Sequence, residues 1–279
     1  MMNSNLKNVN LLLTVMYLGC GLLVVIYANL FPVWKIISDN FSETIIKGAP
    51  FVITVFLTGG LIFAFYRQRR KNQAPIDWIL VISGLAICFF ALFIPDPTII
   101  AKKIHVPEYI LLSLYVRYVM SHKIQHVPLL LFSCLFTIIL GIHDEFLQAV
   151  HPRRTYGLRD LLVNGVAGTG AGFIWHGFNL FKNNLPASPP LQKKSAIHFF
   201  FLFWLLLSLL GLISPLFSYR SYVIPSWPFF PLTAAVLFYF CLLRNDNSDW
   251  SHGLLVISFS SFLLLLYPLL LNSVKMVFY

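Results

Sequence analysis

Long apolar runs alternate with short polar stretches along the whole of this chain of 279 residues. A helix needs roughly 20 apolar residues to cross a bilayer, and most of these runs approach that length. The pattern predicts nine helices: Leu11–Phe31, Ala49–Tyr66, Ile76–Ile94, Val106–Met120, Pro128–Gly141, Leu161–Phe178, Ile197–Phe217, Val223–Leu243 and Gly253–Leu271. The connections between them are short, as in packed helical bundles. We therefore expect one all-α membrane domain over residues 1–279, folded as a polytopic transmembrane helical bundle.

Two of the predicted helices are shorter than a full span. The helix from Val106 is expected to begin near His105, and the helix from Pro128 is expected to continue through Asp144 and Gln148. Polar side chains near a bilayer surface allow such an extension.

Composition agrees with this pattern. The chain is 58% hydrophobic and 11% charged, with a mean hydropathy of +0.78, whereas soluble domains carry about 25% charged residues. The run after Lys7 lacks a small-residue cleavage site and is interpreted as a retained first span. The net charge of +10 comes from Lys and Arg in short loops, which favours topology signals and lipid headgroup contacts over nucleic acid.

The four cysteines lie in apolar segments without metal-ligand or Cys-x-x-Cys spacing. We expect Cys20, Cys88, Cys134 and Cys241 to be buried thiols, and no metal and no cofactor is expected.

The distribution of basic residues predicts an orientation. The cluster Arg67–Lys71 is expected on the cytoplasmic side, which places the N-terminus inside and, with nine spans, the C-terminus outside. Lys182, Lys193 and Lys194 then also lie inside. The cations that fall outside, against the positive-inside rule, include Lys102, Lys103, Arg153, Arg154 and Arg159. A functional basic site on the outer side would explain this exception.

Two polar stretches are expected to meet at that outer surface. The first runs from Lys102 to Tyr109, where His105 and Glu108 are three residues apart and can share a helical face. The second runs from Gly141 to Gly172. Its polar residues at helical spacing are Asp144, Glu145, Gln148, Asp160 and Asn164, with Arg154 in the connecting loop. Ionisable groups at a membrane are costly unless they pair or act chemically, so both stretches are candidate sites.

Ten residues carry a resemblance to a known family. They are Lys102, His105, Glu108, Tyr109, Asp144, Glu145, Gln148, Arg154, Asp160 and Asn164. In order and spacing they resemble the motif of the VanZ-like family of bacterial membrane proteins, named for a teicoplanin-resistance protein. The match covers about residues 76–172. Two departures are Ala101, where an acidic residue often stands, and Ala167, where glycine is common.

The resemblance implies a cell-envelope protein of the bacterial cytoplasmic (inner) membrane. It implies a four-helix core over about residues 76–178, flanked by helices in 1–75 and 179–279. The ten matched residues become the expected ligand-binding set, and the preferred partner is a membrane lipid, either anionic or polyprenyl-linked.

Each of these candidate residues also has a simpler, structural interpretation. His105 and Glu108 could form only a structural pair, and Arg153 and Arg159 could be headgroup anchors. Arg154 is expected to pair with one of the buried carboxylates, Asp144, Glu145 or Asp160. The Gly-x-x-x-Gly at residues 168 and 172 is expected to pack closely against another helix.

Three functions are compatible with these residues. The preferred one is binding of an anionic envelope lipid or lipid-linked saccharide, with an effect on sensitivity to glycopeptide antibiotics of the teicoplanin type. The second is an intramembrane enzyme acting on a phosphorylated lipid, with catalytic candidates His105, Glu108, Asp144 and Glu145. The third is a purely structural membrane protein. No recognised catalytic motif is present, so the enzyme is the less favoured hypothesis.

Overall fold

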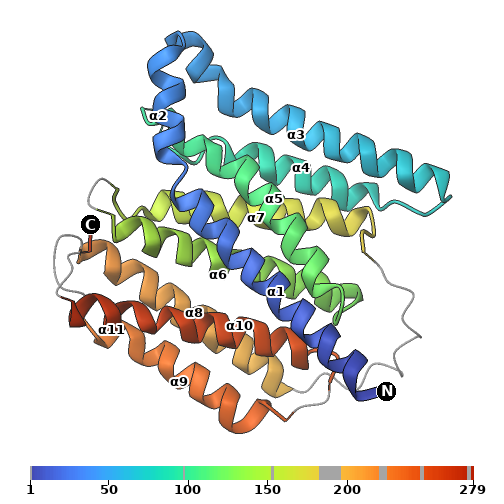
Figure 1. Ribbon diagram of the computed structural model, residues 1–279, viewed down its shortest axis with the longest axis vertical. Coiled ribbons are helices and arrows are strands. Elements are labelled where there is room, and N and C mark those ends of the chain that lie inside the picture. Colours follow the sequence, from blue (N-terminus) through green and yellow to red (C-terminus); the bar gives the residue numbers. More distant parts are fainter. Residues whose placement is uncertain are drawn as a thin grey trace.

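The computed structural model describes residues 2–96, 98–151, 154–181, 196–219, 225–245, 248–274 and 278–279, with the side chains of residues 2–9 excepted. These residues form helices and their connections, drawn in Figure 1. In chain order the elements are α1 (Met2–Ala28), α2 (Phe31–Asn40), α3 (Glu43–Lys71), α4 (Trp78–Ala91), η1 (Ile100–Ile104), α5 (His105–Met120), α6 (His126–Ala149), α7 (Leu158–Gly177), α8 (Ala196–Ser218), η2 (Trp227–Phe229), α9 (Phe230–Phe238), η3 (Tyr239–Leu243), α10 (Ser251–Leu264) and α11 (Leu266–Ser273).

Each of the nine predicted ranges overlaps helix in the described part of the chain, with ends that differ by a few residues. The predicted extensions are confirmed, because α5 begins at His105 and α6 continues to Ala149. Among the described residues, the helical stretches long and apolar enough to cross a membrane are Asn10–Asn40, Glu43–Lys71, His126–Ala149, Ala196–Ser218 and Ser251–Ser273. The fold is therefore an all-helical bundle with the dimensions and composition of a membrane protein.

Some predictions differ from the structure or fall outside it. The sequence pattern does not predict α2, which begins with Pro32 in its first turn, and it predicts one helix where the chain forms α10 and α11. Cys20, Cys88 and Cys134 are buried as expected, but Cys241 is exposed, so that prediction was wrong. The predictions that lie outside the described residues concern Arg153, Lys182, Lys193, Lys194 and the helix start at Val223.

Helix α7 lies at the centre of the N-terminal half and contacts α4, α5 and α6. Small residues allow this close approach. A Cβ atom on Gly170 would lie 2.8 Å from Cys88 Sγ on α4, and one on Gly168 would lie 2.6 Å from Thr137 Cγ2 on α6. Gly172 faces Cys134 of α6 in the same way. The Gly-x-x-x-Gly of α7 therefore packs against α6, as predicted.

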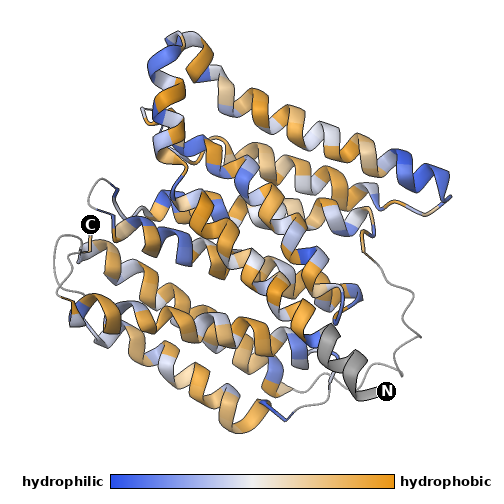
Figure 2. Ribbon diagram, viewed as in Figure 1, coloured by the Kyte–Doolittle hydropathy of each residue, from blue (hydrophilic) through white to orange (hydrophobic). Residues whose placement is uncertain are grey.

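The surface of the bundle is apolar over most of its length. Figure 2 shows hydrophobic residues along most of the length of the helices and hydrophilic residues gathered at several of their ends. Phe56 of α3 is 77% exposed and Ile79 of α4 is 79% exposed. Lipid tails are the solvent that such faces require, because large exposed apolar patches are rare on soluble monomers.

The two polar stretches lie at the same end of the bundle, where α5 and α7 begin and α6 ends (Figure 1). The basic residues Arg67–Lys71 lie at the opposite end, at the end of α3. The relative placement expected from the sequence is therefore observed, whichever way the bundle is oriented.

The end of α6 is held by aromatic residues of the C-terminal half. Phe146 packs against Tyr267 and Phe278, with ring centroids 4.9 and 5.8 Å away. The backbone adds two hydrogen bonds, from Tyr279 N to Ala149 O and from Tyr156 N to Tyr279 O, each 2.8 Å long. The last residues of the chain thus fix the loop between α6 and α7, which positions the polar cluster described next.

Candidate functional site

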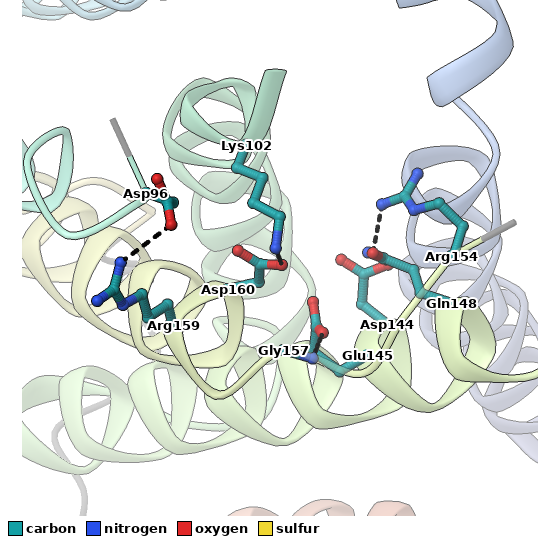
Figure 3. A network of polar contacts seen from close by, with 9 residues as sticks. All are labelled: Asp96, Lys102, Asp144, Glu145, Gln148, Arg154, Gly157, Arg159 and Asp160. Atoms are coloured by element: carbon teal, nitrogen blue, oxygen red, sulfur yellow. Dashed lines mark hydrogen bonds and ion pairs between the residues drawn. The ribbon is translucent and has the colours of Figure 1, made fainter. Parts of the chain in front are cut away.

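An ion pair joins the two polar stretches. Lys102 lies in η1, just before α5, and Asp160 lies in the first turn of α7. Lys102 Nζ donates a hydrogen bond to Asp160 Oδ2 at 2.6 Å (Figure 3). The Asp160 side chain is 2% exposed and that of Lys102 is 27% exposed. Segments 58 residues apart are therefore brought together, and a carboxylate at a helix N-terminus is also favoured by the helix dipole.

The first turn of α5 holds a second pair. His105 Nδ1 lies 2.9 Å from Glu108 Oε2, and both side chains are buried. The i, i+3 spacing on a helix places the two groups on one face, as the sequence indicates. Pro107 sits in this turn, where its missing N–H costs little.

A chain of hydrogen bonds crosses from α5 to the loop after α6. The Tyr109 hydroxyl donates to Asp144 Oδ2 at 3.1 Å, and Gln148 Nε2 donates to Asp144 Oδ1 at 3.0 Å. Arg154 Nη2 then donates to Gln148 Oε1. Its guanidinium carbon also lies 5.2 Å from the centre of the Phe31 ring of α2, within cation–π range.

The predicted partner of Arg154 was wrong. Sequence reasoning assigned it to Asp144, Glu145 or Asp160, but its hydrogen bond goes to the amide oxygen of Gln148 (Figure 3). Gln148 stands between Arg154 and Asp144 because the spacing of four residues on α6 places Gln148 above that carboxylate. Among the described residues, Arg154 therefore forms no direct ion pair with these carboxylates.

Glu145 fixes the start of α7. Its Oε2 accepts a hydrogen bond from Gly157 N at 3.0 Å, and the side chain is fully buried. Asn164, one turn further along α7 than Asp160, is also fully buried. It lies against Gly141, where an added Cβ would approach Asn164 Cβ to 3.1 Å. Glu145 and Asn164 thus shape the wall between α6 and α7.

Several buried polar atoms of this cluster have no hydrogen-bond partner among the described residues. They are Glu108 Oε1, Glu145 Oε1, Asp160 Oδ1 and both amide atoms of Asn164. Buried polar groups are ordinarily satisfied by protein, water or ligand. Their concentration in one cluster marks it as a place where protons, water or a bound molecule complete the hydrogen bonding.

A cavity of about 200 Å³ adjoins the cluster. Four of the ten candidate residues line it: Lys102, His105, Glu108 and Arg154. The other six form the layer behind and are Tyr109, Asp144, Glu145, Gln148, Asp160 and Asn164. Most of the remaining lining is apolar and includes Tyr27 of α1, Phe31 and Trp34 of α2 and Ile53 of α3.

The α1 and α2 residues of this cavity were missed by sequence reasoning. They lie outside the family motif, and their apolar character is typical of any span in this chain. The one usable signal is Pro32, which favours a helix start after the first span and hence a fold-back of α2 toward the cluster.

An exposed pair lies at the edge of the site. Arg159 Nη1 is 3.5 Å from Asp96 Oδ2, with side chains 63% and 39% exposed. The pKa of the Asp96 carboxyl lies below its usual value because the hydroxyl and backbone N–H of Thr98 donate hydrogen bonds to it. Arg159 thus contacts a loop carboxylate outside the cavity.

Among the described residues, no group of three or more His, Cys, Asp or Glu side chains is arranged to hold a metal ion. The carboxylates of the cluster instead contact cations, hydroxyl and amide donors of the protein itself. Comparison of the chain with protein-family models, with curated proteins and with solved structures finds no match.

Proposed function

We propose that this chain is a VanZ-like integral membrane protein of the bacterial cell envelope that binds an anionic lipid or lipid-linked saccharide. The observation that carries the proposal is the cavity, which is apolar along α1, α2 and α3 and charged where Lys102 and Arg154 reach it. An amphiphile with a hydrocarbon chain and an anionic headgroup matches both parts of this lining.

Arg154 is the proposed headgroup contact. Its guanidinium can form two parallel hydrogen bonds to a phosphate or carboxylate, and Gln148 and Phe31 hold it in place. Lys102 adds positive charge at the same wall, although Asp160 already accepts one of its hydrogen bonds. The buried carboxylates behind are proposed to position the basic groups rather than to contact the ligand.

We further propose a multi-pass protein of the cytoplasmic membrane with the cavity on the extracytoplasmic side. The support is Arg67–Lys71 at the opposite end of the bundle, since clusters of basic residues mark the cytoplasmic end. A lipid-linked ligand held at the outer leaflet would connect this site to sensitivity to teicoplanin-type glycopeptides, the role that the family resemblance implies.

The test compares three variants in detergent, with phosphatidylglycerol retention measured by native mass spectrometry. Arg154→Gln is expected to weaken retention by about tenfold, because a charge-assisted hydrogen-bond pair is lost. Arg154→Lys keeps the charge but not the two-pronged geometry, so its affinity should be intermediate. Arg159→Gln is the matched control, since it removes a cation from the same end of the bundle but outside the cavity. Equal retention by Arg154→Gln and wild type would overturn the proposal.

The His105–Glu108 pair supports a second candidate, an enzyme that acts on a phosphorylated lipid. A histidine held 2.9 Å from a carboxylate at a cavity wall has the geometry of a general base and its orienting group. Under this hypothesis, His105→Gln abolishes phosphate release or transfer from a lipid phosphate while phosphatidylglycerol retention persists. Under the binding hypothesis, no variant and no wild-type sample shows turnover. Under a purely structural role, both variants lower detergent stability and neither changes retention.

A further inference from the structure

A second cavity lies at the end of the bundle opposite the polar cluster. It is about 140 Å³ in volume and is formed where α5 ends, α6 begins and α7 ends. Arg117, His126, Val127, His176 and Asn179 contribute to its lining. None of these residues belongs to the site described above.

Arg117 is a buried cation without a carboxylate partner. It is 2% exposed, yet no carboxylate of the described residues forms an ion pair with it. Its Nε donates to Leu180 O at 3.3 Å, and its Nη1 lies 3.4 Å from His176 Nδ1. The remaining terminal nitrogen, Nη2, has no hydrogen bond within the described part of the chain. A buried charge is costly unless it is paired. An anion bound beside this guanidinium would therefore lower the cost of burying its charge.

The surroundings add positive potential. The cavity includes the first residues of α6, whose first turn contains no acidic residue. The N-terminus of a helix of this length attracts anions through its dipole and its N–H groups. Pro128 has no N–H and Leu129 N donates to Gln125 O, so the N–H groups of His126 and Val127 are the ones in the first turn that can face an anion. Arg69 of α3 also reaches this region, where its Nη2 donates to the carbonyl oxygen of Asn179. One arginine and a helix N-terminus therefore line this small space, and a second arginine contacts Asn179 at its edge.

Two residues of the lining have left-handed backbones. His126 has φ 54° and Asn179 has φ 50°. Such conformations are uncommon outside glycine, and they concentrate at functional sites where the surrounding structure maintains them. Here they turn the chain into and out of the helices that border the cavity.

We propose that this cavity binds a small oxyanion, namely a phosphate group, with Arg117 as its principal contact. Drug-sized ligands occupy about 300–1,000 Å³, so a cavity of about 140 Å³ fits a single phosphate group, free or on a lipid headgroup, but not the whole of a drug-sized molecule. A lipid headgroup and free phosphate share this chemistry. The proposal does not depend on the lipid site at the other end of the bundle.

The experiment uses the full-length protein in nanodiscs of phosphatidylcholine, a zwitterionic lipid. Binding of inorganic phosphate is measured by isothermal titration calorimetry, and retention of phosphatidylglycerol in detergent is measured by native mass spectrometry. Arg117→Gln is expected to weaken whichever of the two probes binds by about tenfold or more. Lys123→Gln, the control, removes an exposed cation nearby that does not line the cavity, and should leave binding unchanged.

A second pair of variants tests the site without removing a buried group. Val127 is 61% exposed and lies in the first turn of α6. Val127→Glu places a carboxylate at the cavity, where it should compete with phosphate, although a carboxylate at this position favours the helix itself. Val127→Gln has nearly the same shape without the charge.

Loss of phosphate binding in Val127→Glu but not in Val127→Gln supports a site for free phosphate. If Val127→Glu, but not Val127→Gln, loses phosphatidylglycerol and neither variant changes phosphate binding, the result supports a site for a lipid headgroup. Failure of wild type to bind either probe, or equal binding by Val127→Glu and Val127→Gln, would overturn the proposal.

Discussion

The two ends of the bundle bury charge in opposite ways. At the end where α5 and α7 begin, the buried acids Asp144, Glu145 and Asp160 accept hydrogen bonds from donors of the protein itself (Figure 3). The buried Glu108 lies 2.9 Å from His105. At the other end, the buried charge is Arg117, whose hydrogen bonds within the described part of the chain go to a backbone carbonyl and a histidine. The first end is an acidic network with basic groups at its edge, and the second is an isolated cation.

This difference determines what each end can bind. Carboxylates that are already hydrogen-bonded mainly hold neighbouring groups in position, as Asp144 does through Gln148 for Arg154. A cation without a carboxylate keeps its charge for a ligand. The same difference means that mutations should destabilise the two ends to different extents. Breaking a buried ion pair leaves a lone charge behind, whereas removing an isolated charge does not.

Lys102→Met should have the largest effect on stability. Asp160, 2% exposed, would lose its cation and remain buried without a charged partner, which is expected to cost about 3 kcal/mol. The free energy of unfolding can be measured by titration with dodecyl sulfate in mixed micelles. The double variant Lys102→Met/Asp160→Leu should recover most of the loss, since no unpaired charge is left. A double variant as unstable as the single one would contradict this account of the ion pair.

Tyr109→Phe should have the next largest effect. It removes the hydroxyl that donates to Asp144 Oδ2 while keeping the fully buried ring, and the loss is expected to be about 2 kcal/mol in the same titration. Tyr118→Phe on the same helix is the matched control, because Tyr118 is 39% exposed and its hydroxyl makes no hydrogen bond among the described residues. Equal losses in the two variants would show that the bond to Asp144 contributes nothing.

Local sequence spacing predicts only part of this site. The pairs within one helix, His105 with Glu108 and Asp144 with Gln148, follow from spacings of three and four residues. The meeting of the two polar stretches follows from antiparallel helices joined by short loops. The approximate positions of the nine helical ranges follow from hydropathy, because long apolar runs are distinctive, whereas α2 and the division between α10 and α11 do not.

The rest depends on how the helices are rotated against one another. Lys102 and Asp160 are 58 residues apart, and their pairing requires a particular register of α5 on α7. The partner of Arg154 depends on the path of a loop. Arg117 lies within a predicted span whose pattern indicates only burial, so its cavity emerges only when α5, α6 and α7 are assembled.

Arg117→Met should cost less than either substitution at the acidic end. Arg117 gives up hydrogen bonds to Leu180 O and His176, but no buried carboxylate is left unpaired. The apolar side chain also avoids the desolvation of a charge, so the expected loss is about 1 kcal/mol. The same unfolding titration compares it directly with Lys102→Met. A loss as large as that of Lys102→Met would show that Arg117 is a structural anchor, and the two ends would then not differ as argued.

Arg159→Gln should have the smallest effect on stability. It tests whether burial explains why substitutions at the acidic end are costly, because Arg159 lies at that end but is exposed. Arg159 and Asp96 belong to the acidic end, and their atoms lie 3.5 Å apart, yet both side chains are more than a third exposed. Exposed pairs gain little because water and salt screen their attraction. The thermal melting temperature in detergent should be indistinguishable from wild type at both low and high salt. A clear decrease at low salt that disappears at high salt would mean that the charge of this end, and not only its burial, stabilises the fold.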